Sequence, residues 1–134
     1  MKLLLDTNAL LWWALQEDAE HSDAGRLIAD PSNEVLLSVV SLWEVVIKQR
    51  VAKLNVALDV LIALAEAQRF TRLGIEDRHL QALVRLPFHH RDPFDHLLIA
   101  QAIAEDAAFV TRDREAARYP IIVIAGGSSV AAEN

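Results

Sequence analysis

Short apolar runs that alternate with helical patterns constrain the fold of this chain more than any other feature of its sequence. Apolar residues fill these runs almost continuously, which is typical of strands buried on both faces of a parallel sheet. We expect strands over residues 2–5, 34–38, 72–75, 108–111 and 121–124. The sequence therefore predicts an α/β fold with a central, mostly parallel sheet that helices cover on both faces.

Segments with helical periodicity or helix-start signals lie between these strands. Ser22 and Asp92 stand at capping positions, and Pro93 follows Asp92 where proline is favoured in a helix. We expect helices over residues 8–16, 23–29, 41–53, 57–70, 76–86 and 93–106. A chain of 134 residues is large enough for one buried core. We expect one domain over residues 1–125 and a flexible tail over residues 126–134.

Composition narrows the class of protein. The chain is 53% hydrophobic, yet its apolar runs are far shorter than a membrane span, and the first run is too short for the core of a signal peptide. Cysteine is absent, which excludes disulfides and thiolate metal sites. We therefore expect a cytoplasmic protein that does not contact a membrane. The formal net charge of −6 argues against broad electrostatic binding of nucleic acid but allows a basic rim around an acidic pocket.

Four acidic residues from separate segments are expected to meet at one edge of the sheet. Asp6 ends the first strand, and Asp113 comes just after the strand over residues 108–111. Glu44 lies on the helix after the second strand, and Asp95 lies in the first turn of the helix that Asp92 caps. In parallel sheets, ligands bind at the carboxyl ends of the strands. The sequence therefore predicts a pocket of carboxylates at this edge.

A divalent cation removes the repulsion between crowded carboxylates. Oxygen ligands without cysteine favour a hard ion such as Mg²⁺ or Mn²⁺, which can polarise a phosphate and activate a water molecule. Each acid also has a simpler interpretation. Asp6 suits a helix cap, Asp113 a turn, and Asp95 the favourable end of a helix dipole. Glu44 suits a solvated face, although its apolar neighbours leave it little water.

The segments that carry these acids resemble the successive motifs of PIN domains, and more narrowly the VapC-type toxins of bacteria and archaea. They read LLDTN over residues 4–8, SLWE over 41–44, DPFDHLLIAQA over 92–102 and VTRD over 110–113. The resemblance spans residues 2–124, with the motifs in the order of the family. It implies a three-layer α/β/α sandwich and a ribonuclease that depends on Mg²⁺ or Mn²⁺.

The resemblance also implies the residues and partners of the site. The catalytic and metal-binding residues would be Asp6, Glu44, Asp95 and Asp113, and the supporting polar residues Asn8, Ser41 and Thr111. Toxins of this type cleave RNA, form homodimers and are silenced by an antitoxin encoded beside them. The antitoxin carries the DNA-binding module, so operator DNA would contact this chain only indirectly.

Basic residues near these motifs are candidates for RNA contact. They are Lys48, Arg91, Arg112 and Arg114. Such side chains would hold phosphates and contribute position rather than sequence choice, although Lys48 also suits an ordinary solvated face. His89 and His90 suggest a competing, metal-free acid–base mechanism. Adjacent side chains rarely face one substrate together, so we favour the metal-dependent mechanism.

Two adjacent tryptophans mark a candidate interface. Trp12 and Trp13 are neighbours on one expected helix, so we expect one of them to be exposed and to bind an antitoxin segment together with Leu11 and Leu15. The simpler alternative is that both tryptophans belong to one large core.

Two other functions remain as alternatives to the ribonuclease. One is a non-catalytic PIN-like module that binds a partner, but such a module is expected to lose one or more acids, and all four are present. The other is a phosphatase or phospho-acceptor domain that uses Asp6. A receiver-type acceptor would need a lysine near the last strand, and no lysine follows Lys53.

Overall fold

A computed structural model describes residues 1–87 and 92–126 of the chain. The strands are β1 (Lys2–Leu5), β2 (Glu34–Ser38), β3 (Thr71–Leu73), β4 (Ala108–Thr111) and β5 (Val123–Ala125). The α-helices are α1 (Thr7–Leu15), α2 (Asp23–Ala29), α3 (Val39–Arg50), α4 (Leu58–Ala67), α5 (Asp77–Val84) and α6 (Pro93–Glu105). Two short 3₁₀ helices, η1 (Ala19–His21) and η2 (Arg114–Arg118), complete the described elements.

The strands form one sheet in the order β3-β2-β1-β4-β5, and every neighbouring pair is parallel. The chain builds outward from β1 to β3 on one side and then returns to add β4 and β5 on the other. The order of the strands therefore reverses between β1 and β4, which pair through Leu4 and Phe109. In open parallel sheets, this reversal is where a crevice opens beyond the carboxyl ends of the strands.

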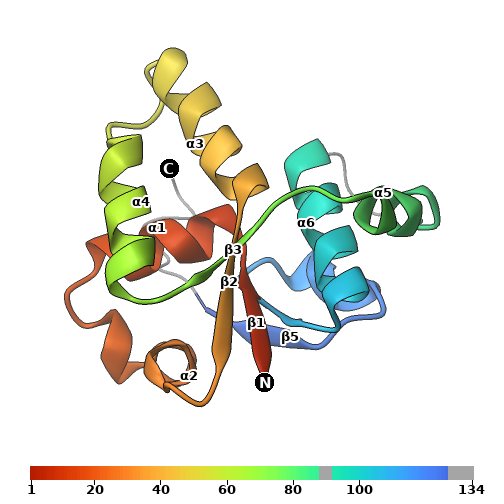
Figure 1. The fold of residues 1–134 in the computed structure, drawn as a ribbon, viewed down its shortest axis with the longest axis horizontal. Coiled ribbons are helices and arrows are strands. Elements are labelled where there is room, and N and C mark those ends of the chain that lie inside the picture. Colours follow the sequence, from red (N-terminus) through yellow and green to blue (C-terminus); the bar gives the residue numbers. More distant parts are fainter. Residues whose placement is uncertain (88–91, 127–134) are drawn as a thin grey trace.

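Side-chain alternation along the strands divides the core into two clusters, one on each face of the sheet. Leu3 and Leu5 of β1 belong to the cluster that α1, α2 and α4 cover. Leu4 belongs to the other cluster, with Leu98 and Ile99 of α6. Figure 1 shows the two helical layers on either side of the sheet, with α5 outside α6. The fold is thus the expected α/β sandwich of three layers.

The sequence predicts the strands of the interior better than the edges. The strands over residues 2–5, 34–38 and 108–111 are confirmed at both ends, whereas β3 and β5 begin one residue earlier and two residues later than expected. Helix α3 begins at Val39 rather than Ser41, because the Ser38 hydroxyl accepts a hydrogen bond from the Val40 amide and acts as the cap. The caps predicted at Ser22 and Asp92 are confirmed.

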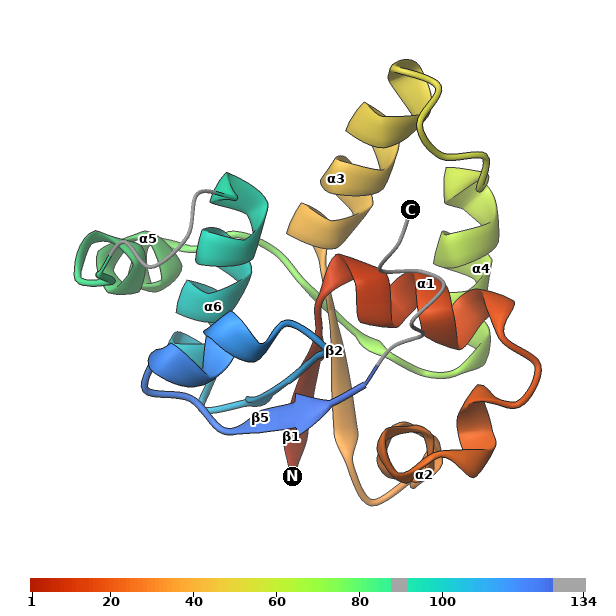
Figure 2. The same ribbon diagram turned by 180° about the vertical axis from the view of Figure 1, so that it is seen from behind.

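Three helices surround the carboxyl end of β1. Figure 2 shows α1, α3 and α6 around the same end of the sheet.

The packed part of the chain extends at least to Gly126, which is buried and whose amide bonds to the Thr111 carbonyl oxygen. The remaining residues of the expected tail, 127–134, lie outside the described residues. None of the described helices has the length and apolar character that crossing a bilayer requires.

Candidate metal-binding carboxylate site

The four acids predicted from the sequence line one pocket, as expected. The pocket has a volume of about 320 Å³ and opens at the carboxyl edge of the sheet. Its lining residues are Asp6, Thr7, Asn8, Glu44, Lys48, Asp92, Asp95, Arg112 and Asp113. Five acids from four segments of the sequence therefore line the same pocket as two cations, Lys48 and Arg112.

Asp6 is held in place by hydrogen bonds to both of its carboxylate oxygens. Oδ1 accepts a bond of 2.7 Å from the Ala9 amide, which makes Asp6 the cap of α1, and Oδ2 accepts one of 2.5 Å from the Thr111 hydroxyl. The side chain is buried, with the residue only 6% exposed. The simpler interpretation of Asp6 as a cap is therefore correct, and it is compatible with a place in the site.

Glu44 is also fixed by two partners. The Thr7 hydroxyl donates a hydrogen bond of 2.5 Å to Glu44 Oε1, and the Lys48 ammonium lies 3.0 Å from Oε2. Glu44 is 5% exposed, so the interpretation as a solvated face is wrong for this residue. The contact with Thr7 ties α3 to the beginning of α1.

Asp113 lines the pocket from the beginning of η2. Asp113 Oδ1 accepts a bond of 3.0 Å from the Glu115 amide, so this acid caps η2. The Asp113 amide donates to the Thr111 hydroxyl, which in turn donates to Asp6. One buried hydroxyl thus connects the acid after β1 with the acid after β4.

Burial and mutual repulsion shift the pKa values of two of the acids upward. The pKa of Asp95 rises from 3.8 to about 8, chiefly because the carboxyl is buried, and further because Asp92, Asp6, Glu44 and Asp113 lie near it. The pKa of Asp6 rises to about 6 through burial, although its bonds from Thr111 and Ala9 oppose the shift. Without another cation, the pocket therefore holds protons near neutral pH.

The residues of the pocket fit a divalent metal ion of the hard class. Carboxylate oxygens are the ligands that Mg²⁺ and Mn²⁺ prefer, and a cation among these carboxyls would oppose the upward pKa shifts of Asp6 and Asp95. Asp6, Glu44, Asp95 and Asp113 come from four different elements and need no rearrangement of the backbone to share the pocket.

The supporting residues implied by the resemblance have different positions. Asn8 lines the pocket, and Thr111 bonds to Asp6. Ser41 is fully buried and does not line the pocket, and no described residue forms a hydrogen bond with its hydroxyl.

Some of the candidate RNA-binding residues line the pocket, and others do not. Lys48 and Arg112 line the pocket, whereas Arg114 is exposed outside its lining. Arg91, His89 and His90 lie outside the described residues. The structure thus brings two of the predicted basic residues to the acids.

The expectation that one of the two tryptophans is exposed is wrong. Trp12 is 8% exposed and belongs to the core, and Trp13 is half-buried and packs against the same cluster. Leu11 is also 8% exposed, whereas Leu15 is 57% exposed. A nine-residue helix that lies across the sheet presents neighbouring side chains to one wide core, so both rings contact it.

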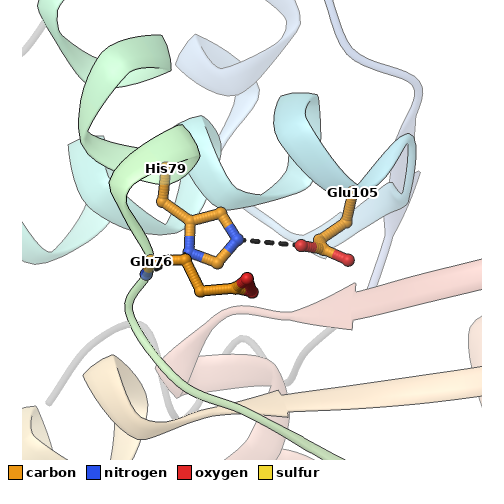
Figure 3. A group of neighbouring side chains, drawn as sticks. All are labelled: Glu76, His79 and Glu105. Carbon is orange, nitrogen blue, oxygen red and sulfur yellow. Dashed lines mark hydrogen bonds and ion pairs between the residues drawn. The ribbon is translucent and has the colours of Figure 1, made fainter.

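A second cluster of possible ligands, Glu76, His79 and Glu105, lies away from the four acids and joins α5 to α6 (Figure 3). Its histidine nitrogens are both used. His79 Nδ1 accepts a bond of 3.0 Å from the Glu76 amide, so Nε2 carries the proton that it donates to Glu105 over 2.8 Å. Arg78 also pairs with Glu105. A neutral imidazole in this state has no lone pair to offer, so the cluster is a structural link rather than a metal site.

The larger hollow of the described chain lies at the opposite, amino-terminal edge of the sheet. It has a volume of about 780 Å³ and is lined mainly by apolar side chains such as Ile103 and Ile122. Of its three charged side chains, Lys2 and Glu105 pair with each other at 3.8 Å, which leaves the single acid Asp106. The concentration of uncompensated charge is therefore in the smaller pocket.

Comparison with known proteins places the chain in a family. The model of the PIN domain matches residues 3–122, which is most of the chain. The chain belongs to the PIN domain family. No curated protein matches this PIN domain in sequence.

Solved structures share the fold of this PIN domain at low sequence identity. VapBC2 from Rickettsia felis, bound to a DNA fragment from its promoter, is 20% identical, with a TM-score of 0.70 over 92% of this chain and 98% of that chain. DNA-bound VapBC from Salmonella typhimurium is 19% identical, with a TM-score of 0.69 over 92% and 97%. VapC20 from Mycobacterium tuberculosis, a toxin that cleaves the sarcin–ricin loop, is 19% identical, with a TM-score of 0.60 over 90% and 96%.

The sequence motifs do not predict two of the pocket residues, Thr7 and Asp92, as part of the site. Thr7 orients Glu44, and a signal for it was present because Thr7 directly follows Asp6. Asp92 was predicted only as a cap. It does cap α6, through bonds from the Phe94 and Asp95 amides, but it also lines the pocket and raises the pKa of Asp95.

The raised pKa of Asp95 predicts how stability depends on pH in the metal-free protein. Between the pKa of the unfolded chain and the value of about 8 in the folded chain, the folded state binds more protons. Stability therefore falls as pH rises through this range. We expect Asp95→Asn to raise the unfolding temperature in chelator by a few degrees at about pH 9, and by less at about pH 5.

Asp59→Asn supplies the matched control, because Asp59 is exposed on α4 outside the pocket. Thermal unfolding followed by circular dichroism measures both variants. An increase in the unfolding temperature of Asp95→Asn that does not change with pH would contradict the assignment of the raised pKa to this carboxyl.

Proposed function

We propose that this PIN domain is a divalent-metal-dependent endoribonuclease, and the toxin of a VapC-type toxin–antitoxin pair. The observation that carries the proposal is the convergence of Asp6, Glu44, Asp95 and Asp113 on one pocket at the carboxyl edge of the sheet. The family match and the shared fold with VapBC and VapC20 structures support it.

The metal-binding residues in this proposal are the same four acids, with Mg²⁺ or Mn²⁺ as the ion. When bound, the ion would polarise the scissile phosphate and lower the pKa of a water molecule, so that hydroxide is available near neutral pH. No histidine base is then required.

The side chains of the site prepare it for this chemistry. Bonds from Ala9 and Thr111 hold Asp6, and the bond from Thr7 holds Glu44, so both carboxylates are oriented in advance. This rigidity reduces the cost of ordering ligands when a cation enters. Asn8 and Arg112 line the same pocket and are placed to bind phosphate oxygens of the RNA backbone.

The proposal competes with a non-catalytic PIN-like module. A module that serves only as a scaffold has no need to place two buried carboxylates, Asp6 and Glu44, beside other acids, since this costs stability unless the charges are compensated. The retention of all four acids, with two raised pKa values, favours catalysis.

Metal-dependent cleavage of RNA tests the proposed function. We expect the purified chain, free of antitoxin, to cut total cellular RNA with Mg²⁺ or Mn²⁺, and to lose cleavage in chelator. Asp6→Asn keeps a group that can cap α1 but removes a charge, so cleavage should fall by at least about a hundredfold. Asp59→Asn should cut at the rate of the unchanged chain.

The ends of the fragments would begin to identify the substrate. Cleavage that survives chelator would contradict the metal-dependent mechanism. A chain that binds metal but cuts no RNA would favour the binding module.

The proposed partners are an antitoxin encoded beside this chain and a second copy of the chain, acting in the cytoplasm. Leu11 and Trp12 are core residues, so the antitoxin surface we propose on α1 narrows to Trp13 and Leu15. Copurification with the protein of the adjacent gene tests this pairing, and Leu15→Asp should weaken it.

An exposed apolar row that runs along α3 to its C-cap, Val51, supports the homodimer. Val39, Trp43, Ile47 and Val51 follow one another at intervals of four residues and are 38%, 52%, 36% and 57% exposed. Residues at this spacing form a ridge on one side of a helix. A ridge of this kind can pack against its own copy across a two-fold axis.

Substitution in the ridge tests the proposed dimer. We expect the unchanged chain to sediment as a dimer and Ile47→Asp to sediment as a monomer, because a buried aspartate at a two-fold contact meets its own charge. Val60→Asp is the control, since Val60 is 58% exposed but lies on α4. A monomeric unchanged chain, or equal dissociation in both variants, would contradict the assignment.

A further inference from the structure

Lys48 is a basic residue placed directly against an acid of the proposed metal site. Its ammonium nitrogen lies 3.0 Å from Glu44 Oε2, and both residues line the carboxylate pocket. The two side chains differ in exposure, with 37% of the lysine and 7% of the glutamate exposed. The glutamate is therefore buried in the pocket, and the lysine is partly exposed to solvent.

The two oxygens of Glu44 have different partners, one neutral and one charged. The neutral Thr7 hydroxyl occupies Oε1, and the charged Lys48 ammonium occupies Oε2. A divalent ion that binds Oε2 would lie within a few ångströms of the ammonium, where like charges repel strongly if water is scarce. Lys48 and a divalent ion therefore compete for the same carboxylate.

The balance of charge in the pocket explains what Lys48 does there. The lining contains five acids and only two cations, Lys48 and Arg112. A lysine on the next helical turn after a glutamate is also a common stabilising pair on exposed helices. Here, however, the glutamate is buried, so its attraction to a nearby cation is screened by water much less than it would be at a surface.

We propose that Lys48 is the resident cation of this pocket: it neutralises Glu44 in the metal-free chain, yields Glu44 to the divalent ion, and then binds a phosphate oxygen of the RNA. The inference rests on the proposed function and adds a role for a residue that the four acids leave unexplained. The flexible lysine stem allows the ammonium to turn from the carboxylate toward the mouth of the pocket.

The affinity for Mn²⁺ tests this role without relying on catalysis. We expect Lys48→Met to bind Mn²⁺ about threefold to tenfold more tightly than the unchanged chain, since it removes a competing charge, as measured by calorimetry or electron paramagnetic resonance. Cleavage of total RNA at saturating Mn²⁺ should nevertheless fall about tenfold, because a charge-assisted bond to phosphate is lost. Tighter metal binding with slower cleavage is a combination that a purely structural pair would not produce.

Two controls separate this effect from a change in net charge or in the fold. Arg50→Met removes the same charge from an exposed position on α3 and should leave Mn²⁺ affinity unchanged. In a Glu44→Gln chain the competition has no carboxylate to act on, so adding Lys48→Met should no longer tighten Mn²⁺ binding. Circular dichroism confirms that each variant is folded.

The outcomes distinguish the two proposals. Unchanged or weaker Mn²⁺ binding by Lys48→Met, beside normal binding and RNA cleavage by the unchanged chain, would overturn the role of Lys48 alone. Failure of the unchanged chain to bind Mn²⁺ would overturn the proposed metal site, and the role of Lys48 with it.

Discussion

Repulsion among carboxylates at the carboxyl edge of the sheet is the constraint on which the site depends. The parallel pairing of β1 with β4 brings Asp6 and Asp113 to this edge, and α3 and α6 add Glu44 and Asp95. Burial beside other carboxylates favours the neutral form of an acid, which is why the pKa values of Asp95 and Asp6 rise to about 8 and 6. A pocket of this kind is stable only when protons, internal cations or a metal ion compensate its charge.

Hydrogen bonds decide which acids are held in a fixed orientation. Asp6 and Glu44 accept bonds from Thr111 and Thr7, whereas no described hydrogen bond reaches the carboxylate of Asp95. Threonine hydroxyls can donate hydrogen bonds to carboxylates without adding charge to the pocket. The strand ends thus supply both the acids and the groups that orient them, and the fold and the site are specified by the same few segments.

Local patterns predicted the strands, two helix caps and the place of the four acids, because continuous apolar runs and cap residues act over a few positions. Contacts between distant segments could not be predicted in the same way. Thr7 and Glu44 are 37 residues apart, and His79 and Glu105 are 26 residues apart, so no spacing rule links them. The burial of Trp12 is not predicted by its sequence neighbours, because one core cluster accepts neighbouring side chains of α1 and only the packing of that helix reveals it.

The central claim is that the crowded carboxylates form a binding site for a divalent cation. Proton release on metal binding tests this claim most directly. Calorimetric titration of the chain with Mn²⁺ at about pH 7, in buffers with different ionisation enthalpies, counts the protons released for each ion bound. Because Asp95 has a pKa of about 8 and Asp6 one of about 6, the account predicts a net release, mostly from Asp95. Binding of Mn²⁺ without proton release would show that the acids are already ionised and would contradict the account.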